Sequence, residues 1–192
     1  MIKKNAIHPL IKERWSPRAF DPKIPDEKDL ILLFESASLA ASCYNEQPWR
    51  FIYATKNEET RYQELLSCLV EFNQMWVKTA PVIILTLSRK HFAQNGNDNA
   101  HGWHDVGLAI GNMSVQATHM NLYLHQMAGF SSDKAREVFQ IPDEFDVVSM
   151  IALGYVGDPG QLPEDIRKME TREREQRPLD KIIFTDDWKA ME

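Results

Sequence analysis

The sequence predicts an α+β fold, and three observations support this. Apolar residues recur at helical spacing in some segments and form short β-branched or aromatic runs in others. The two kinds of segment alternate irregularly, so a regular series of βαβ units is not expected. The glycine patterns GxGxxG and GxxxxGK(S/T), which mark common dinucleotide and triphosphate sites, are both absent.

The first half of the chain predicts two helices and two strands. Leu30, Leu33 and Ala37 form an apolar stripe at helical spacing, and Asp26 stands where it can cap that helix. Pro48 discourages helix at the preceding residue, which favours a loop before the next strand. The expected elements are a helix after Asp26, a loop over 40–48, a strand over 49–55, a helix over 57–71 and a strand over 82–87.

The second half is dominated by a long helix, expected over 101–126. It contains no proline and is rich in small residues, so it is either a central core helix or a helix at a dimer interface. The expected elements after it are a helix over 133–140, a strand over 146–156, a solvated charged helix within 161–175 and an apolar extended segment over 181–185. The tail is either an arm that reaches across a second subunit or a C-terminal edge strand.

Composition and charge argue against several classes of function. The net charge of −6 disfavours a broad nucleic-acid-binding face, which needs a basic surface. No apolar run approaches the roughly 20 residues needed to span a bilayer, and the N-terminus lacks the apolar core of a signal peptide. The two cysteines, Cys43 and Cys68, have no CxxC spacing. We therefore expect a cytoplasmic protein without disulfides and without membrane or nucleic-acid partners.

The segment Arg14-Trp-Ser-Pro-Arg18 is a candidate anion site. Pro17 favours an extended conformation at Ser16, and alternate side chains of an extended chain point to the same side. Arg14, Ser16 and Arg18 would then converge on one face. Two guanidiniums flanking a hydroxyl suit a phosphate, because arginine offers bidentate and permanently charged donors. The alternative is a pair of surface arginines in weak ion pairs.

A second candidate site is the polar loop from Ser42 to Trp49. It places hydrogen-bonding side chains between a helix and an aromatic strand, where ligand contacts often concentrate. Taken alone, the loop is better explained as an ordinary polar turn.

Together these two segments resemble the nitroreductase-like family of FMN enzymes. The resemblance rests first on Arg14, Ser16, Arg18 and Phe20, and then on the pattern Ser-x-x-Asn-x-Gln-Pro-Trp that begins at Ser42. Further segments match in the same order along the chain, namely 80–85, 104–113, 126–130, 151–155 and 177–180. Each motif is modest, but their shared order spans nearly the whole chain.

The resemblance implies a fold and an assembly. The fold is a single FMN-binding domain over 1–192, with a central mixed, mainly antiparallel sheet flanked by helices and an extended C-terminal arm over 176–192. The assembly is a homodimer, because in the family the loop corresponding to 41–45 contacts the flavin of the other subunit.

The resemblance also assigns roles to individual residues. Arg14 and Arg177 would hold the FMN phosphate, and Arg18 would lie near the pyrimidine edge, where a cation stabilises the negative charge that reduction adds. Asn73 would read the polar edge of the ring, and the backbone of 127–129 would face flavin N5. The implied cofactor-binding residues are Arg14, Ser16, Arg18, Ala41, Ser42, Cys43, Asn45, Gln47, Asn73, Met127, Ala128, Gly129 and Arg177.

The implied activity is that of an FMN-dependent oxidoreductase. It would use NADH or NADPH to reduce nitroaromatics, quinones or similar small acceptors by ping-pong hydride transfer through flavin N5. No side chain need act as a general acid or base, because the chemistry belongs to the cofactor. Two departures from the family stand out. Cys43 replaces a frequent serine, and Glu175 replaces a second basic residue before Arg177, which removes one cation from the phosphate site.

Two other functions remain open from the sequence. The first is a flavin-binding protein for storage or sensing, with no turnover. The second is a zinc site on His101 and His104, which lie one helical turn apart. The HExxH pattern is absent, so solvated or capping histidines are the favoured interpretation.

Overall fold

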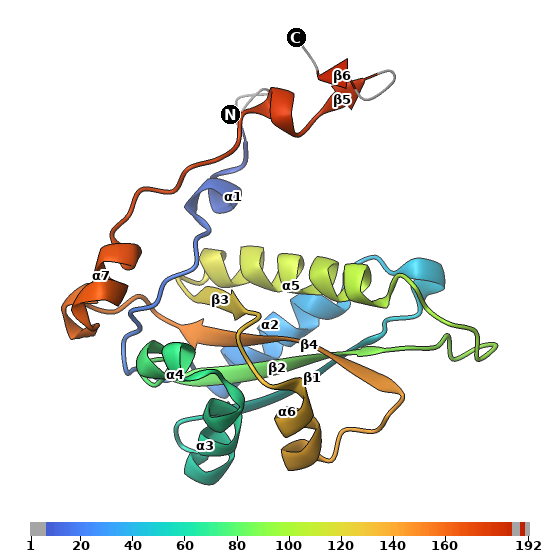
Figure 1. Cartoon of the computed structure of the whole chain (residues 1–192), viewed down its shortest axis with the longest axis horizontal. Helices are drawn as coiled ribbons and strands as arrows, with labels where there is room; N and C mark the ends of the chain where they lie inside the picture. The colour runs from blue at the N-terminus through green and yellow to red at the C-terminus, as the bar shows by residue number, and fades with distance from the viewer. Residues whose placement is uncertain (1–6, 186–188, 191–192) are drawn as a thin grey trace.

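The computed structural model describes residues 7–185 and 189–190. Its centre is a four-stranded sheet of order β1-β2-β4-β3, in which every neighbouring pair is antiparallel, and helices cover both faces (Figure 1). The helices are α1 (Pro9–Glu13), α2 (Glu27–Ser38), α3 (Glu59–Cys68), α4 (Glu71–Val77), α5 (Gly102–His119), α6 (Ser132–Phe139) and α7 (Glu164–Glu170). The strands are β1 (Trp49–Thr55), β2 (Val82–Arg89), β3 (Tyr123–Met127), β4 (Phe145–Gly154), β5 (Phe184–Thr185) and β6 (Lys189–Ala190). Three 3-10 turns, η1 (Cys43–Asn45), η2 (Pro159–Gln161) and η3 (Leu179–Lys181), complete the described elements.

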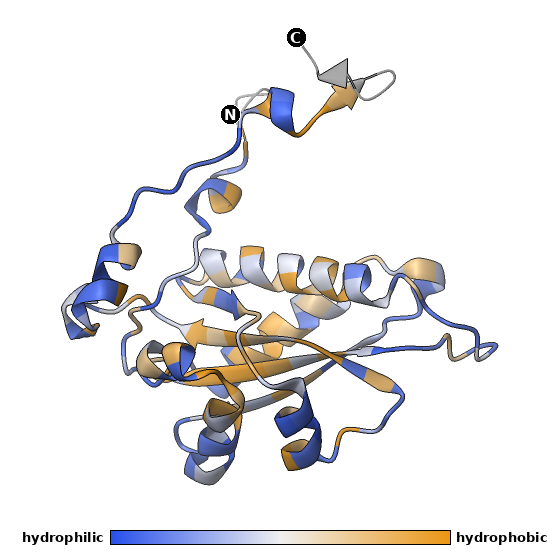
Figure 2. Cartoon of the chain, in the orientation of Figure 1, coloured by the Kyte–Doolittle hydropathy of each residue, from blue (hydrophilic) through white to orange (hydrophobic). Residues whose placement is uncertain are grey.

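Alternate residues of β2 enter two separate hydrophobic cores. Ile83 and Leu85 join the core made with α3, α4 and α6, whereas Val82 and Ile84 join the core made with α2 and α5. Every residue from Val82 to Ser88 is buried, as the continuous apolar run predicts. Figure 2 shows that apolar residues gather on the central strands. The predicted α+β fold with a flanked, mainly antiparallel sheet is confirmed, and the sheet is antiparallel throughout the described residues.

The long helix α5 ends earlier than the sequence predicts. It stops at His119, and residues 123–126, expected to lie in its last turns, belong to strand β3. The physical reason is Asn121, which adopts a left-handed φ of 58°. The Leu122 N–H then donates to the Ala117 carbonyl at 2.8 Å and closes the helix end. The chain reverses at this turn, which allows β3 to pair with β4.

The helix expected over 57–71 is divided into two helices. Helix α3 ends where Leu69 becomes extended and forms a β-bridge to the segment after β3. The Val70 N–H donates to the Gly129 carbonyl at 3.0 Å, and α4 begins at the next residue. The sequence does not predict α4, although it carries the candidate residue Asn73.

The remaining predicted elements are confirmed with small shifts of their ends. Asp26 occupies the N-cap position of α2, but its side chain makes no capping hydrogen bond. The charged segment over 161–175 contains the short helix α7, which buries Ile166 and Glu170. The prediction of a solvated helix is therefore wrong at Glu170.

After α7 the chain leaves the body of the fold as an extended arm (Figure 1). Residues 171–179 are all exposed. Large apolar side chains near the end of the described arm are also exposed, with Leu179 at 69% and Ile182 at 55%. The sequence predicts that the segment over 181–185 is extended throughout. Its first residue instead ends the 3-10 turn η3, and its last two residues form β5, which pairs with β6. In the single chain, the arm therefore presents apolar surface to solvent.

Candidate functional site

Basic side chains gather in a cleft between the N-terminal segment and the C-terminal part of α7. This cationic cleft has a volume of about 470 Å³. It is lined by Lys12, Arg14, Trp15, Ser16, Arg18, Met169, Glu170, Arg172, Glu173 and Arg174. Five of these residues are basic and two are acidic, so the cleft suits an anion.

The N-terminal wall of the cationic cleft is held by bonds to distant parts of the chain. The Thr79 hydroxyl donates to the Arg18 carbonyl at 3.3 Å. The Glu170 carboxylate accepts the backbone N–H groups of Arg18 and Ala19, at 2.9 and 3.3 Å. Gly157 lies directly against this segment, where any Cβ would clash with the backbone of Phe20. The wall is therefore a fixed structure rather than a free N-terminal extension.

Two guanidiniums lie near each other in the cationic cleft. Arg14 donates to the Ser16 hydroxyl at 3.3 Å, and Arg174 donates to the Arg14 backbone carbonyl at 2.6 Å. Burial, and then the charge of Arg174, lower the pKa of Arg14. Among the described residues, no carboxylate lies within 4.0 Å of either guanidinium. Like charges held together in this way are stabilised by an anion that binds to both.

A second cluster of candidate residues joins α4 to the segment after β3. The Asn73 side-chain amide donates to the Gly129 carbonyl at 2.9 Å, and the Trp76 indole N–H donates to the Asn73 amide oxygen at 3.3 Å. A Cβ at position 129 would lie 2.7 Å from the Asn73 nitrogen and 3.0 Å from Val70. A side chain at position 129 would therefore have to displace the Asn73 amide from this close contact.

His125 connects the second cluster to the cationic cleft. Its ring N–H donates to the Pro17 carbonyl at 2.9 Å, and its ring packs on Trp76 with 4.5 Å between the ring centroids. Burial, the largest cause, and the nearby Arg18 charge lower the pKa of His125 to about 4, against hydrogen bonds from the ring to the backbone that raise it. The imidazole is therefore neutral at pH 7. A continuous series of contacts thus runs from Pro17 through His125 and Trp76 to Asn73.

The loop from Ala41 to Gln47 lies at the start of α5. The buried Asp105 carboxylate accepts the Cys43 N–H at 2.9 Å, and the Ser42 hydroxyl accepts the Gln47 N–H at 3.0 Å. Three loop residues have left-handed φ angles, namely Tyr44 (52°), Asn45 (57°) and Gln47 (51°). Asp105 therefore holds a locally strained backbone in one shape.

The structure brings some of the predicted residues together and leaves others apart. Arg14, Ser16 and Arg18 line the cationic cleft. In the adjoining cluster, Asn73 donates a hydrogen bond to the Gly129 carbonyl, and Met127 and Ala128 directly precede Gly129 in the chain. The loop over 41–47 lies at the N-terminal end of α5, whereas α7 lies near the opposite end of that helix (Figure 1). Arg177 is exposed in the arm and does not line the cationic cleft.

Other parts of the described chain offer less as functional sites. Its residues include no group of three or more histidine, cysteine, aspartate or glutamate side chains placed to hold a metal ion. His104 instead lies 3.2 Å from the Asp105 carboxylate, so the zinc alternative lacks further ligands in the described chain. None of the described helices is long and apolar enough to cross a bilayer.

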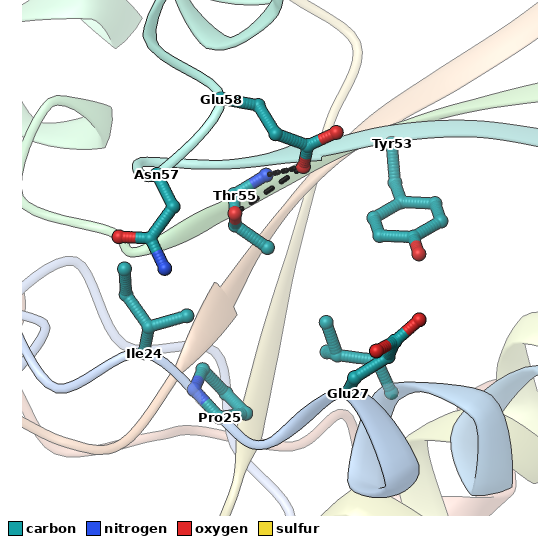
Figure 3. Close-up of a pocket in the computed structure, with 8 residues that line it drawn as sticks. Ile24, Pro25, Glu27, Tyr53, Thr55, Asn57 and Glu58 are labelled. Carbon is teal, nitrogen blue, oxygen red and sulfur yellow. Dashed lines mark hydrogen bonds between the residues drawn. The ribbon is translucent and has the colours of Figure 1, made fainter.

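A separate cleft of about 290 Å³ lies between the start of α2 and the end of β1 (Figure 3). It contains none of the predicted site residues. One of its two carboxylates, Glu58, already accepts the N–H and hydroxyl of Thr55, at 3.1 and 3.2 Å. The cationic cleft and its adjoining cluster are therefore the better candidate site.

Comparison with known proteins gives the family of the chain. The model of the nitroreductase family matches residues 11–155. The chain belongs to the nitroreductase family. The match begins just before the cationic segment and ends after β4, so it covers Arg14, Asn73 and Gly129.

Solved structures of the family share the fold. A structure described as an oxidoreductase containing FMN is 32% identical, covers 98% of this chain and 96% of its own, and superposes with a TM-score of 0.91. A nitroreductase family protein from Streptococcus pneumoniae TIGR4 is 22% identical, with 92% and 98% covered and a TM-score of 0.73, and this likeness concerns the fold alone.

Curated relatives match over shorter stretches. The major NAD(P)H-flavin oxidoreductase of Aliivibrio fischeri is 29% identical over 96 residues, which is 47% of this chain and 44% of that protein. The chain spans between 39% and 56% of the length of the first three curated relatives it matches.

Four residues that sequence reasoning missed support the candidate site. They are Asp105, His125, Glu170 and Arg174. All four act through contacts with residues more than 60 positions away, and three of them, Asp105, His125 and Glu170, have no local signal in the sequence. Arg174 has a weak signal, because Glu175 and Gln176 leave it as the nearest basic residue before Arg177.

Proposed function

We propose that this protein is an FMN-dependent oxidoreductase that uses NADH or NADPH to reduce small acceptors such as nitroaromatics or quinones. The observation that carries the proposal is the pair of guanidiniums, Arg14 and Arg174, in a cleft joined through His125 to the Asn73–Gly129 cluster. Relatives named as an FMN-containing oxidoreductase and an NAD(P)H-flavin oxidoreductase support the cofactor and the reductant.

The described residues could hold FMN from its phosphate at one end to its ring at the other. Arg14, Arg174 and the Ser16 hydroxyl would hold the phosphate, with Arg177 brought in from the arm. Arg18 and Asn73 would reach the polar edge of the ring, and the backbone of 127–129 would face its reactive edge. When bound, FMN supplies the electron-transfer chemistry, and the protein supplies binding, orientation and charge.

We infer that the working unit is a homodimer. The loop over 41–47 belongs to the predicted flavin site, yet in one chain it lies at the far end of α5, whose 18 residues extend over about 27 Å. A second copy would bring Ala41, Ser42, Cys43, Asn45 and Gln47 to the cationic cleft of the first. The outer face of α5, with exposed Leu108 and Val115 beside open space at Gly107 and Gly111, suits such a contact.

The proposal implies one binding place shared by reductant and acceptor. The GxGxxG dinucleotide-binding motif is absent from the sequence, so both substrates would occupy the same face of the site in turn. We therefore expect ping-pong kinetics, with hydride passing through flavin N5. The place of action is proposed to be the cytoplasm.

One purification and one assay test the proposed function. The purified protein should be yellow and should release FMN on denaturation, and its NAD(P)H oxidation with a quinone or nitroaromatic should give parallel double-reciprocal lines. A flavin-loaded protein without turnover would support a storage or sensing role instead. A protein that does not retain FMN at saturating cofactor would refute the proposal.

A further inference from the structure

Glu170 is a buried carboxylate in the wall of the cationic cleft. Its side chain is 1% exposed, although most other residues of α7 face solvent. Burying a carboxylate costs several kcal/mol unless hydrogen bonds and an opposite charge compensate it. The position of Glu170 therefore depends on the partners that surround it.

All the described partners of Glu170 belong to the segment that carries Arg18. Both carboxylate oxygens accept the Arg18 backbone N–H, at 3.0 and 2.9 Å, and one of them also accepts the Ala19 N–H at 3.3 Å. The Arg18 guanidinium lies 3.9 Å from the same carboxylate. Glu170 thus holds the backbone of Arg18 and also places a negative charge beside its side chain.

The charge of Glu170 opposes the effect expected of Arg18. A cation at the polar edge of a flavin favours the reduced form, because reduction adds negative charge there. A carboxylate beside that cation weakens its field, and the effect is large where water is excluded. Among the described residues, no other carboxylate lies within 4.0 Å of the Arg18 guanidinium.

We propose that Glu170 is a positioning residue that holds Arg18 in the cationic cleft and, through its own charge, lowers the midpoint potential of the bound flavin. The inference rests on the proposed function, because it requires FMN beside Arg18. It assigns to Glu170 a part in tuning the cofactor in addition to its part in the fold.

A matched pair of variants separates the effect of Glu170 on the flavin midpoint potential from the effect of removing any carboxylate from the cationic cleft. Glu170→Gln removes the charge and keeps a side-chain oxygen for the backbone N–H groups. Glu173→Gln removes an exposed carboxylate that lines the same cleft and has no described partner. The midpoint potential of bound FMN is measured for both variants and the wild type by equilibrium titration with a reference dye, at saturating FMN.

We expect the midpoint potential to shift in opposite directions when Glu170 and Arg18 are replaced. Glu170→Gln should move the midpoint potential to a more positive value, Arg18→Met should move it to a more negative value, and Glu173→Gln should leave it near that of the wild type. In the Arg18→Met background, the shift caused by Glu170→Gln should shrink, since the cation that it modulates is gone. By linkage, Glu170→Gln should also raise the ratio of affinities for reduced and oxidised FMN.

Three outcomes would overturn the inference. They are an unchanged potential in Glu170→Gln, an equal shift in Glu173→Gln, or a full shift that persists without Arg18. If Glu170→Gln does not fold, Glu170→Asp keeps the charge but draws it back from Arg18, and its potential should shift in the same direction by less. A wild-type potential in Glu170→Asp would then count against the inference. Failure of the wild type itself to bind FMN would instead refute the proposed function.

Discussion

At the scale of single residues, the site is decided by charges that lack ordinary partners. The lowered pKa of Arg14 arises from burial and from the charge of Arg174, and neither arginine has a carboxylate partner among the described residues. This arrangement also compensates for Glu175, which stands where the resemblance leads one to expect a second basic residue. Arg174 stands one position earlier and folds back toward Arg14. In the proposed FMN site it would supply the second cation for the phosphate from the same charged segment.

Removing either cation should weaken FMN binding through its phosphate. For Arg14→Ala or Arg174→Ala we expect a ten- to hundredfold loss of affinity, because a charge-assisted hydrogen bond contributes roughly 1.5 to 3 kcal/mol. Riboflavin, which lacks the phosphate, should bind these variants and the wild type alike. Quenching of flavin fluorescence measures both affinities.

The control for this prediction is Arg167→Ala, an exposed change on α7 outside the cationic cleft, which should leave FMN binding unaltered. Arg177→Ala tests the arm in the same assay, and a loss comparable to that of Arg14→Ala would bring Arg177 into the phosphate site. Equal losses for riboflavin and FMN would show that the arginines act on the fold instead.

His125 should make stability depend on pH. Its pKa is about 4 in the folded protein and ordinarily about 6.5, so only the unfolded chain gains this proton between these values. The contribution of neutral His125 is therefore present above pH 6.5 and is lost as the pH falls toward 4, by roughly 3 kcal/mol in total.

The measurement is urea unfolding at several pH values in the wild type and in His125→Gln. The difference between their free energies of unfolding should shrink as the pH falls from 6.5 to 4. His119→Gln, at an exposed position on α5, should follow the wild type. A difference that stays constant across this range would remove His125 from the acid response.

At the scale of elements, the turn after α5 and the break between α3 and α4 build the second cluster. Asn121 ends the helix in a left-handed conformation, and the strand that follows carries His125 toward Pro17. The break at Leu69 starts α4 against the Gly129 carbonyl, which places Asn73 at that segment. Both features come from chain reversals rather than from hydrophobic periodicity.

Gly129→Ala should disturb this junction of elements. The new Cβ would lie 2.7 Å from the Asn73 nitrogen, so we expect a displaced Asn73, weaker FMN binding and a free energy of unfolding lowered by about 1 kcal/mol or more. In the double variant with Asn73→Ala the two losses should be less than additive, because the clash is relieved. Fully additive losses would contradict the proposed contact between these elements.

At the scale of the whole molecule, one chain holds the parts of the predicted site at two distant places. The cationic cleft lies beside α7, the loop over 41–47 lies at the start of α5, and the arm leaves the fold with exposed apolar side chains (Figure 1). A second copy of the chain would satisfy all three features at once.

Gly111→Leu tests the assembly without disturbing the single chain. Nothing lies within 4 Å of a Cβ at this position, and leucine favours helix over glycine by up to about 1 kcal/mol. The monomer should therefore remain folded, while dimer formation and FMN retention should decrease together. Light scattering and absorbance measure these quantities. A variant that stays dimeric and fully loaded would move the interface elsewhere, and a flavin-loaded wild-type monomer would refute the dimer.

The sequence by itself determined the family, the buried strand β2, the two-sided helical cover and the cationic segment from Arg14 to Arg18. These features depend on local periodicity and on short motifs, which a single chain displays without reference to distant residues. Only the tertiary structure decided that Glu170 is buried, that Arg174 completes the cation pair and that His125 links the two halves of the site. Each of these three depends on contacts between residues more than 100 positions apart, and the free energy of such contacts is set by packing rather than by neighbours in the sequence.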